Sequence, residues 1–192
     1  MSPVTHFLSG WVVATVAPLD RRDRALVTFA SVIPDIDGFG LPFEVLTRGS
    51  PHPLTWWSGY HHLLGHNLGF TLLTTLIAAF ISKRKVITMT LVFVTFHLHL
   101  LQDLLGARGP DGHQWPIPYL LPFSNQWQLV WRGQWALNAW PNFVLTLILI
   151  LVTIYLAWKK GYSPVEMFSA RADQAFVHAL RRRFGAGSKD FA

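Results

Sequence analysis

The 192-residue chain contains no cysteine, which excludes disulfide bonds and thiolate metal sites. Charged residues are also scarce: they make up 14% of the chain, against about a quarter of an ordinary soluble domain. Hydrophobic residues account for 51%, and nine Trp and fourteen Phe add an aromatic excess. This composition is typical of a membrane protein with aromatic side chains at the membrane interfaces. Any transition-metal site in it must use histidines and carboxylates.

Long apolar runs predict membrane helices. Three of them approach or exceed 20 residues, enough to cross a hydrocarbon core of about 30 Å at about 1.5 Å per residue; they are Leu63–Ser82, Val86–Leu105 and Trp135–Trp158. Two shorter runs, Pro3–Leu19 and Arg24–Ile33, precede them. These are either short tilted crossings or a re-entrant hairpin, and we favour two short crossings. The predicted fold is an all-α polytopic bundle of about five membrane helices, two short and three long.

The remaining segments predict loops and a tail. Residues 34–58 and 106–134 are rich in Pro and Gly, which favours surface loops. Ser163-Pro164-Val165-Glu166 has the form of a capping box with proline at the first helical position. It predicts an amphipathic helix that ends before Gly185 and lies on an anionic membrane surface or on the protein itself. We therefore expect a membrane-embedded domain, residues 1–162, and a cytoplasmic amphipathic tail, residues 163–192.

The basic residues predict the orientation in the membrane. If five crossings alternate, the connections 20–24 and 83–85 and everything after Trp158 share one side. That side holds thirteen of the sixteen Lys and Arg residues. Because loops rich in Lys and Arg stay in the cytoplasm, we expect a multi-pass inner-membrane protein with a cytoplasmic C-terminus. The same pattern accounts for the net charge of +6 without a nucleic-acid partner.

The histidines gather on the opposite side. Eight of the nine lie at or near the external helix ends or in the external loops, and only His178 is internal. Aspartates accompany them. Ionisable groups at membrane depth are costly and usually mark a functional site. Because the topology was derived without the histidines, their gathering on one side is independent information.

Spacing within this group predicts a metal site. His99 and Asp103 are four residues apart, so both project from one face of a helix. His62 and His66 have the same spacing. One histidine on an apolar helix is more often a packed residue than a ligand, and one HxxxD pattern is weak. Asp35 and Asp37 directly after Pro34, and His6 on the first helix, are two further elements at the same membrane face. The four elements together favour a metal, with Zn²⁺ best matched and Mn²⁺ or Fe²⁺ also possible.

The order of these motifs resembles a known family. The blocks are Thr5-His6, Pro34-Asp35-Ile36-Asp37, His61 to His66, His99 to Asp103 and Pro122-Phe123-Ser124. Over residues 5–124 the chain resembles the YdjM-type inner-membrane metal-dependent hydrolases, whose pattern is TH, PDxD, HRxxTHS, HxxxD and PFS. It differs at His62, Gly65 and Asn67, where that pattern has Arg, Thr and Ser. Spacing alone pairs His62 with His66, whereas the resemblance implies His61 with His66. We take His61 and keep His62 as the alternative.

The resemblance also implies a chemistry. The family is similar to the zinc-dependent phospholipase C and single-strand nuclease group, which implies phosphoester hydrolysis at clustered metals. The implied metal ligands are His6, Asp35, Asp37, His61, His66, His99 and Asp103. They outnumber the three or four protein ligands that one zinc takes, so we expect two ions. An aspartate left free of metal, Asp37 or Asp111, could act as general base, and Arg108 could pair with a phosphate.

The sequence therefore predicts a membrane-bound hydrolase that cleaves a phosphoester of a lipid or lipid-linked substrate at the extracytoplasmic face. The aromatic residues of the 106–134 loop would place the site at the level of the lipid headgroups. Two other classes remain open: a metal or proton transporter, and a structural membrane protein with a folding zinc. A transporter needs ligands along its whole route, and the cytoplasmic halves of the predicted spans carry none.

Overall fold

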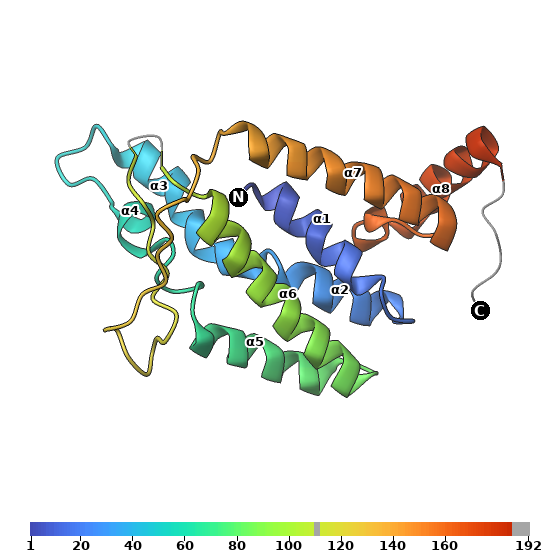
Figure 1. The fold of residues 1–192 in the computed structure, drawn as a ribbon, viewed down its shortest axis with the longest axis horizontal. Helices are drawn as coiled ribbons and strands as arrows, with labels where there is room; N and C mark the ends of the chain where they lie inside the picture. The colour runs from blue at the N-terminus through green and yellow to red at the C-terminus, as the bar shows by residue number, and fades with distance from the viewer. Residues whose placement is uncertain (110–111, 186–192) are drawn as a thin grey trace.

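The computed structural model describes residues 1–109 and 112–185 of the chain. Within these ranges the chain is helical, with two isolated β-bridges and no β-strand, so the predicted all-α class is confirmed (Figure 1). The elements are α1 (Pro3–Ala14), α2 (Arg21–Ala30), the 3-10 helix η1 (Ile33–Phe39), α3 (Gly40–Thr47), α4 (Trp56–Tyr60), α5 (Leu68–Ile81), α6 (Lys85–Gly106), α7 (Trp140–Lys160), the 3-10 helix η2 (Pro164–Met167) and α8 (Ala170–Phe184).

The long helices give the protein its membrane character. Among the described residues, α6 and α7 are long and apolar enough to cross a membrane. The pair formed by α2 and η1–α3 would be a third such span, bent by 55° at its break. The 14 residues of α5 form a shorter apolar helix. The structure thus has two or three candidate spans, and the five predicted crossings stay a prediction.

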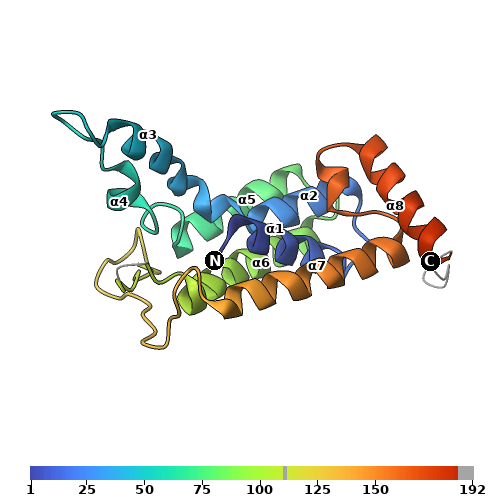
Figure 2. The ribbon, with the colours of Figure 1, turned by 90° about the horizontal axis from the view of Figure 1, so that it is seen from above.

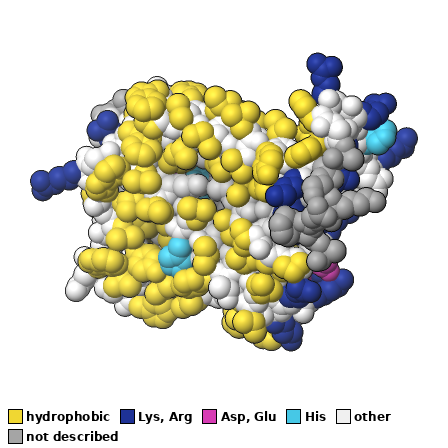
Figure 3. Space-filling model, turned by 45° about the vertical axis from the view of Figure 1, so that its right-hand side comes forward, with side chains coloured by type: hydrophobic (Ala, Val, Ile, Leu, Met, Phe, Trp, Pro, Cys, Tyr) yellow, Lys and Arg dark blue, Asp and Glu magenta, His cyan; other side chains and the backbone are white. Residues whose placement is uncertain are grey.

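The bundle is built around α1 and α6. α6 packs against α5, α2 and α1, and α1 also packs against α2 and α7. Ala14, Val27 and Val92 form a buried core between α1, α2 and α6, and Phe96 of α6 is buried against Phe70 of α5. Figure 2 shows α3 and α4 projecting from the bundle on one side. The outer helices expose many leucines and isoleucines. The middle of the surface is largely apolar, with most of the visible Lys and Arg at one end and a few at the other (Figure 3). An apolar surface of this extent suits contact with lipid chains.

Buried polar contacts join the basic connections at that end. The carboxylate of Asp23 is fully buried and accepts hydrogen bonds from the backbone N–H groups of Lys83 (3.0 Å) and Arg84 (2.8 Å). Lys83 Nζ also lies 2.7 Å from Asp20 Oδ2, and this hydrogen bond lowers the pKa of Asp20. The connections 20–24 and 83–85 therefore lie side by side, which is the arrangement that the predicted topology requires.

The C-terminal segment differs from the single helix predicted from Ser163. Ser163 caps only the short η2, and α8 begins at Ala170 with Ser169 as its cap. Glu166 forms a bidentate ion pair with Arg24, at 2.7 Å for each hydrogen bond, in place of a capping box. A buried guanidinium left unpaired is costly, so this ion pair outweighs a capping interaction. The predicted end of the helix before Gly185 is confirmed, because Gly185 adopts a left-handed φ of 84° directly after α8.

Three other predicted boundaries are wrong for local reasons. α5 begins at Leu68 and not at residue 63, because Asn67 caps it and the preceding residues form turns. α7 begins at Trp140, with proline in its first turn, so residues 135–139 stay outside it. The segment 34–58, predicted as a loop, contains η1, α3 and α4, since its prolines fall near helix starts, where they are tolerated.

Candidate metal centre

Four side chains meet near the C-terminal end of α6, away from the basic connection that precedes this helix. Asp35, His66, His99 and Asp103 each offer one ligand atom, and the four atoms lie within 4.8 Å of one another. His99 Nε2 lies 2.9 Å from Asp103 Oδ2 and 3.1 Å from His66 Nε2. Asp35 Oδ1 lies 3.8 Å from His66 Nε2 and 3.7 Å from His99 Nε2. This group could hold a divalent metal ion.

Three elements bring these residues together. α6 presents His99 and Asp103 one turn apart on its buried face, as the sequence spacing predicts. Asp35 lies in η1, directly after the bend that follows α2. His66 comes from the turn before α5, where Gly65 approaches η1 so closely that a Cβ would lie 2.1 Å from the carbonyl oxygen of Pro34. Only glycine permits this approach, which carries His66 into the cluster.

Hydrogen bonds on the far side of each ring orient the histidines. His99 Nδ1 lies 2.8 Å from the backbone carbonyl of Ser31, which can only accept. His66 Nδ1 lies 3.3 Å from Asp37 Oδ2, likewise an acceptor. In the neutral ring Nδ1 is therefore the donor, and the lone pair of Nε2 faces the cluster. Metal-binding histidines are held in the same way, with the second nitrogen on a carbonyl or carboxylate.

When both rings are neutral, the cluster lacks the protons that would satisfy its acceptor atoms. With Nδ1 protonated in both rings, the Nε2 atoms of His66 and His99 face each other as acceptors. Asp35 Oδ2 and Asp103 Oδ2 are buried without a hydrogen-bond partner among the described residues. Converging lone pairs in a buried site are costly unless a cation binds them. The donor set therefore fits a divalent metal ion.

His6 extends the cluster from α1. Its Nε2 lies 3.2 Å from Asp103 Oδ1, in a geometry that forms no hydrogen bond, and its Nδ1 lies 2.7 Å from Gln102 Oε1. The rings of His6 and His99 have centroids 3.9 Å apart. The N-terminal amine of Met1 also forms an ion pair with Asp103 Oδ1. Asp103 thus presents one oxygen to His66 and His99 and the other to His6.

Asp37 and His61 lie behind His66 and outside the group of four. Asp37 Oδ1 lies 2.8 Å from His61 Nδ1, and Oδ2 accepts the backbone N–H of Gly65 at 3.0 Å. Both oxygens of Asp37 are therefore engaged in holding the turn that carries His66. The predicted roles of Asp37 as ligand or base, and of His61 as ligand, stay predictions.

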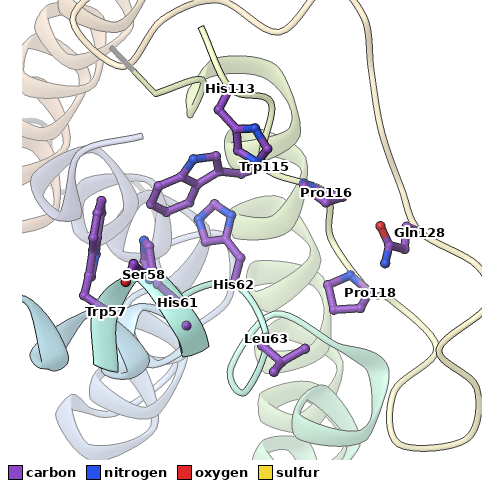
Figure 4. A pocket seen from close by; sticks show the side chains of 11 residues that line it. Trp57, Ser58, His61, His62, Leu63, His113, Trp115, Pro116, Pro118 and Gln128 are labelled. Atoms are coloured by element: carbon purple, nitrogen blue, oxygen red, sulfur yellow. The ribbon is translucent and has the colours of Figure 1, made fainter. Parts of the chain in front are cut away.

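A pocket of about 410 Å³ lies beside the cluster (Figure 4). Its walls include Trp57, His61, His62, His113 and Trp115. The ring centroid of His62 lies 4.2 Å from that of the buried His66, so His62 lies between the pocket and the cluster.

His62, the alternative to His61 in the predicted ligand pair, has an unusual backbone. It adopts a left-handed φ of 68°, which is uncommon for any residue except glycine. Burial lowers the pKa of this imidazole well below its usual range, with a further contribution from the neighbouring His66. Such a conformation persists only where the surrounding structure holds it.

The other predicted site residues lie elsewhere. Arg108 follows α6, where its backbone pairs with residues 135–137, and its side chain is not part of the pocket wall. Asp111 lies outside the described residues. Sequence reasoning missed Gln102, whose signal is its position three residues after His99 on the same helix. It also missed Ser31, which acts through its backbone carbonyl and therefore leaves no signal in the side-chain sequence.

Comparison with known proteins gives one family. A family model described as YdjM inner membrane protein matches residues 1–172. The matched range includes the four clustered residues, His6 and the pocket, and it ends within α8. No curated protein and no solved structure matches the chain.

Proposed function

Because the chain belongs to the YdjM inner membrane protein family, we propose that it is a membrane-bound, metal-dependent hydrolase. Its substrate would be a phosphoester of a lipid or lipid-linked molecule. The observation that carries this proposal is the cluster of converging, unpartnered ligand atoms directly behind a pocket wall. A metal that served only to stabilise the fold would need no pocket beside it. Bound divalent ions would neutralise charge that develops on the phosphate oxygens.

The proposed metal is zinc, with two ions. Two imidazoles and two carboxylates are ligands that zinc takes in hydrolytic sites. Asp103 presents its two oxygens to different partners, which suits a carboxylate shared between two ions. Asp35, His66, His99 and Asp103 Oδ2 would serve the first ion. His6 and Asp103 Oδ1 would serve the second, which would take the place of the Met1 amine that pairs with Oδ1. Asp37 and His61, the other two residues of the predicted set, would hold the turn that carries His66.

The residues around the pocket have their own proposed roles. Trp57 and Trp115 would form the walls against the substrate's head group. Asp37 orients the His61 ring through Nδ1. A ring held in this way can accept a proton from the substrate or donate one to it in the pocket. Arg108, outside the pocket wall, would pair with a phosphate that extends beyond the pocket. Asp111 remains the alternative general base.

The proposed topology has five crossings, with the site at the extracytoplasmic face and the C-terminus in the cytoplasm. It rests on the thirteen basic residues that the alternation assigns to one side. The contacts of Asp23 with Lys83 and Arg84, and of Arg24 with Glu166, support it, because they join three of the basic segments at one end of the bundle.

Cysteine labelling tests this topology, since the chain contains no native cysteine. A cysteine at Ser50 should react with an impermeant thiol reagent added to intact cells. A cysteine at the exposed Gln174 of α8 should react only after permeabilisation. The reversed pattern would place the metal centre at the cytoplasmic face and refute the proposed orientation.

A substrate screen tests the function. Purified protein in liposomes should hydrolyse at least one class of lipid phosphoester, and a chelator should abolish the reaction until zinc is restored. Phosphodiesters, phosphomonoesters and carboxylic esters with matched lipid chains would identify the bond. If folded, zinc-loaded protein cleaves none of them while zinc enters the liposomes, the protein is a transporter and the proposal is wrong.

A further inference from the structure

An apolar groove of about 740 Å³ lies next to the pocket. One wall is the first half of α5, including Phe70, Leu72 and Leu73. The opposite wall is the loop that carries Pro122 and Phe123. Its volume lies within the range of about 300–1,000 Å³ that is typical of small-molecule sites.

The groove and the pocket share part of their walls. Leu63, Pro118 and Gln128 line both. Figure 4 shows these three side chains together at one edge of the pocket, away from Trp57 and His113. A molecule with a polar and an apolar end could therefore place one end in each space and pass over these shared side chains.

Backbone hydrogen bonds between the two walls fix the shape of the groove. The first backbone N–H groups of α5 donate to the loop: Leu68 to the carbonyl of Tyr119 at 2.7 Å, and Gly69 to that of Leu121 at 2.9 Å. A Cβ at Gly69 would lie 2.3 Å from Pro122 Cδ, so only glycine allows this contact. The loop is thus fixed against the helix and the groove is preformed.

We propose that this groove holds a hydrocarbon chain of the lipid whose head group occupies the pocket, an inference that rests on the proposed hydrolase function. The exposed leucines and Phe123 at the groove belong to the apolar surface that would face the bilayer. A chain can therefore enter sideways from the membrane without passing through water. Since such a chain is already out of water, the groove acts by orienting the head group toward the metal centre.

Filling the groove tests this role. Leu73→Trp should lower kcat/KM for a long-chain phosphoester by about tenfold, because the chain no longer orients the head group. It should leave kcat/KM for a soluble, short-chain substrate with the same head group unchanged. Leu147→Trp, at a similarly exposed position on α7, is the matched control and should change neither rate. Equal losses on both substrates, or none on either, would overturn the groove assignment.

A binding measurement separates this inference from the proposed function. Wild-type protein should retain one phospholipid after detergent washing, detected by native mass spectrometry, and Leu73→Trp should lose it while Leu147→Trp keeps it. Phe123→Ser, on the exposed loop wall, provides a second variant if Leu73→Trp does not fold. If no substrate is cleaved but the lipid is lost selectively, the hydrolase proposal fails and the groove assignment stands. Retention of the lipid by every folded variant would refute the assignment of the groove as the site of the lipid chain.

Discussion

His99→Ala should release most of the bound metal and lower the melting temperature of the protein by about 8–16 °C. The imidazole is fully buried, and its Nε2 lies within 3.1 Å of both His66 Nε2 and Asp103 Oδ2. A ligand present at about 1,000 times its Kd stabilises the folded state by roughly 4 kcal/mol, and about 2–4 °C accompany each kcal/mol in a domain of this size. Metal analysis and thermal unfolding in mild detergent would measure both effects.

Two controls separate metal loss from simple loss of packing. His97→Ala removes the same side chain from the same helix, but His97 bonds to the carbonyl of Phe93 and the hydroxyl of Tyr119, outside the cluster. It should keep its metal. A chelator should lower the melting temperature of wild-type protein and of His97→Ala, yet leave His99→Ala unchanged. Wild-type protein that carries no metal and is unaffected by the chelator would rule out the centre.

The fold could be predicted where an element depends on its own sequence alone. α6 lies within one residue of the predicted run at each end, because a predominantly apolar run of 20 residues without Pro or Gly has few alternatives in a membrane. The prediction failed where a tertiary contact competes with a local one. Glu166 pairs with Arg24, 142 residues away, and so the capping-box pattern at Ser163 does not begin a long helix.

The site also contains residues whose positions follow from local spacing and residues whose positions depend on tertiary contacts. HxxxD spacing is sufficient to place His99 and Asp103 on one face of α6. The positions of Asp35 and His66 depend on a bend after α2 and on a turn that Gly65 allows, and neither has a periodic signal. Asp37 belongs to the same PDxD motif as Asp35, yet it faces the Nδ1 atoms of His61 and His66. Motif membership alone does not show which of the two carboxylates enters the cluster.

That distinction between Asp35 and Asp37 sets the order of the activity losses that we expect. Asp35→Asn and His66→Ala should reduce lipid phosphoester hydrolysis to background, since each changes a residue that offers a ligand atom to the group of four. Asp37→Asn should reduce it by about 10- to 100-fold, the usual cost of losing a residue that orients a metal ligand. Arg108→Ala should cause a partial loss if its guanidinium pairs with the phosphate. His97→Ala should keep the wild-type rate.

The metal content of the same variants shows why each rate falls. Asp35→Asn and His66→Ala should lose metal and activity together, because Asp35 and His66 belong to the cluster itself and lose the carboxylate charge and Nε2, respectively. Asp37→Asn keeps an oxygen that can accept a hydrogen bond but loses the negative charge, so it should bind metal more weakly and recover part of its rate at higher zinc concentration. If Asp37→Asn is as inactive as Asp35→Asn and added zinc restores nothing, Asp37 contributes directly to the reaction. Its assignment as the residue that orients His66 is then wrong.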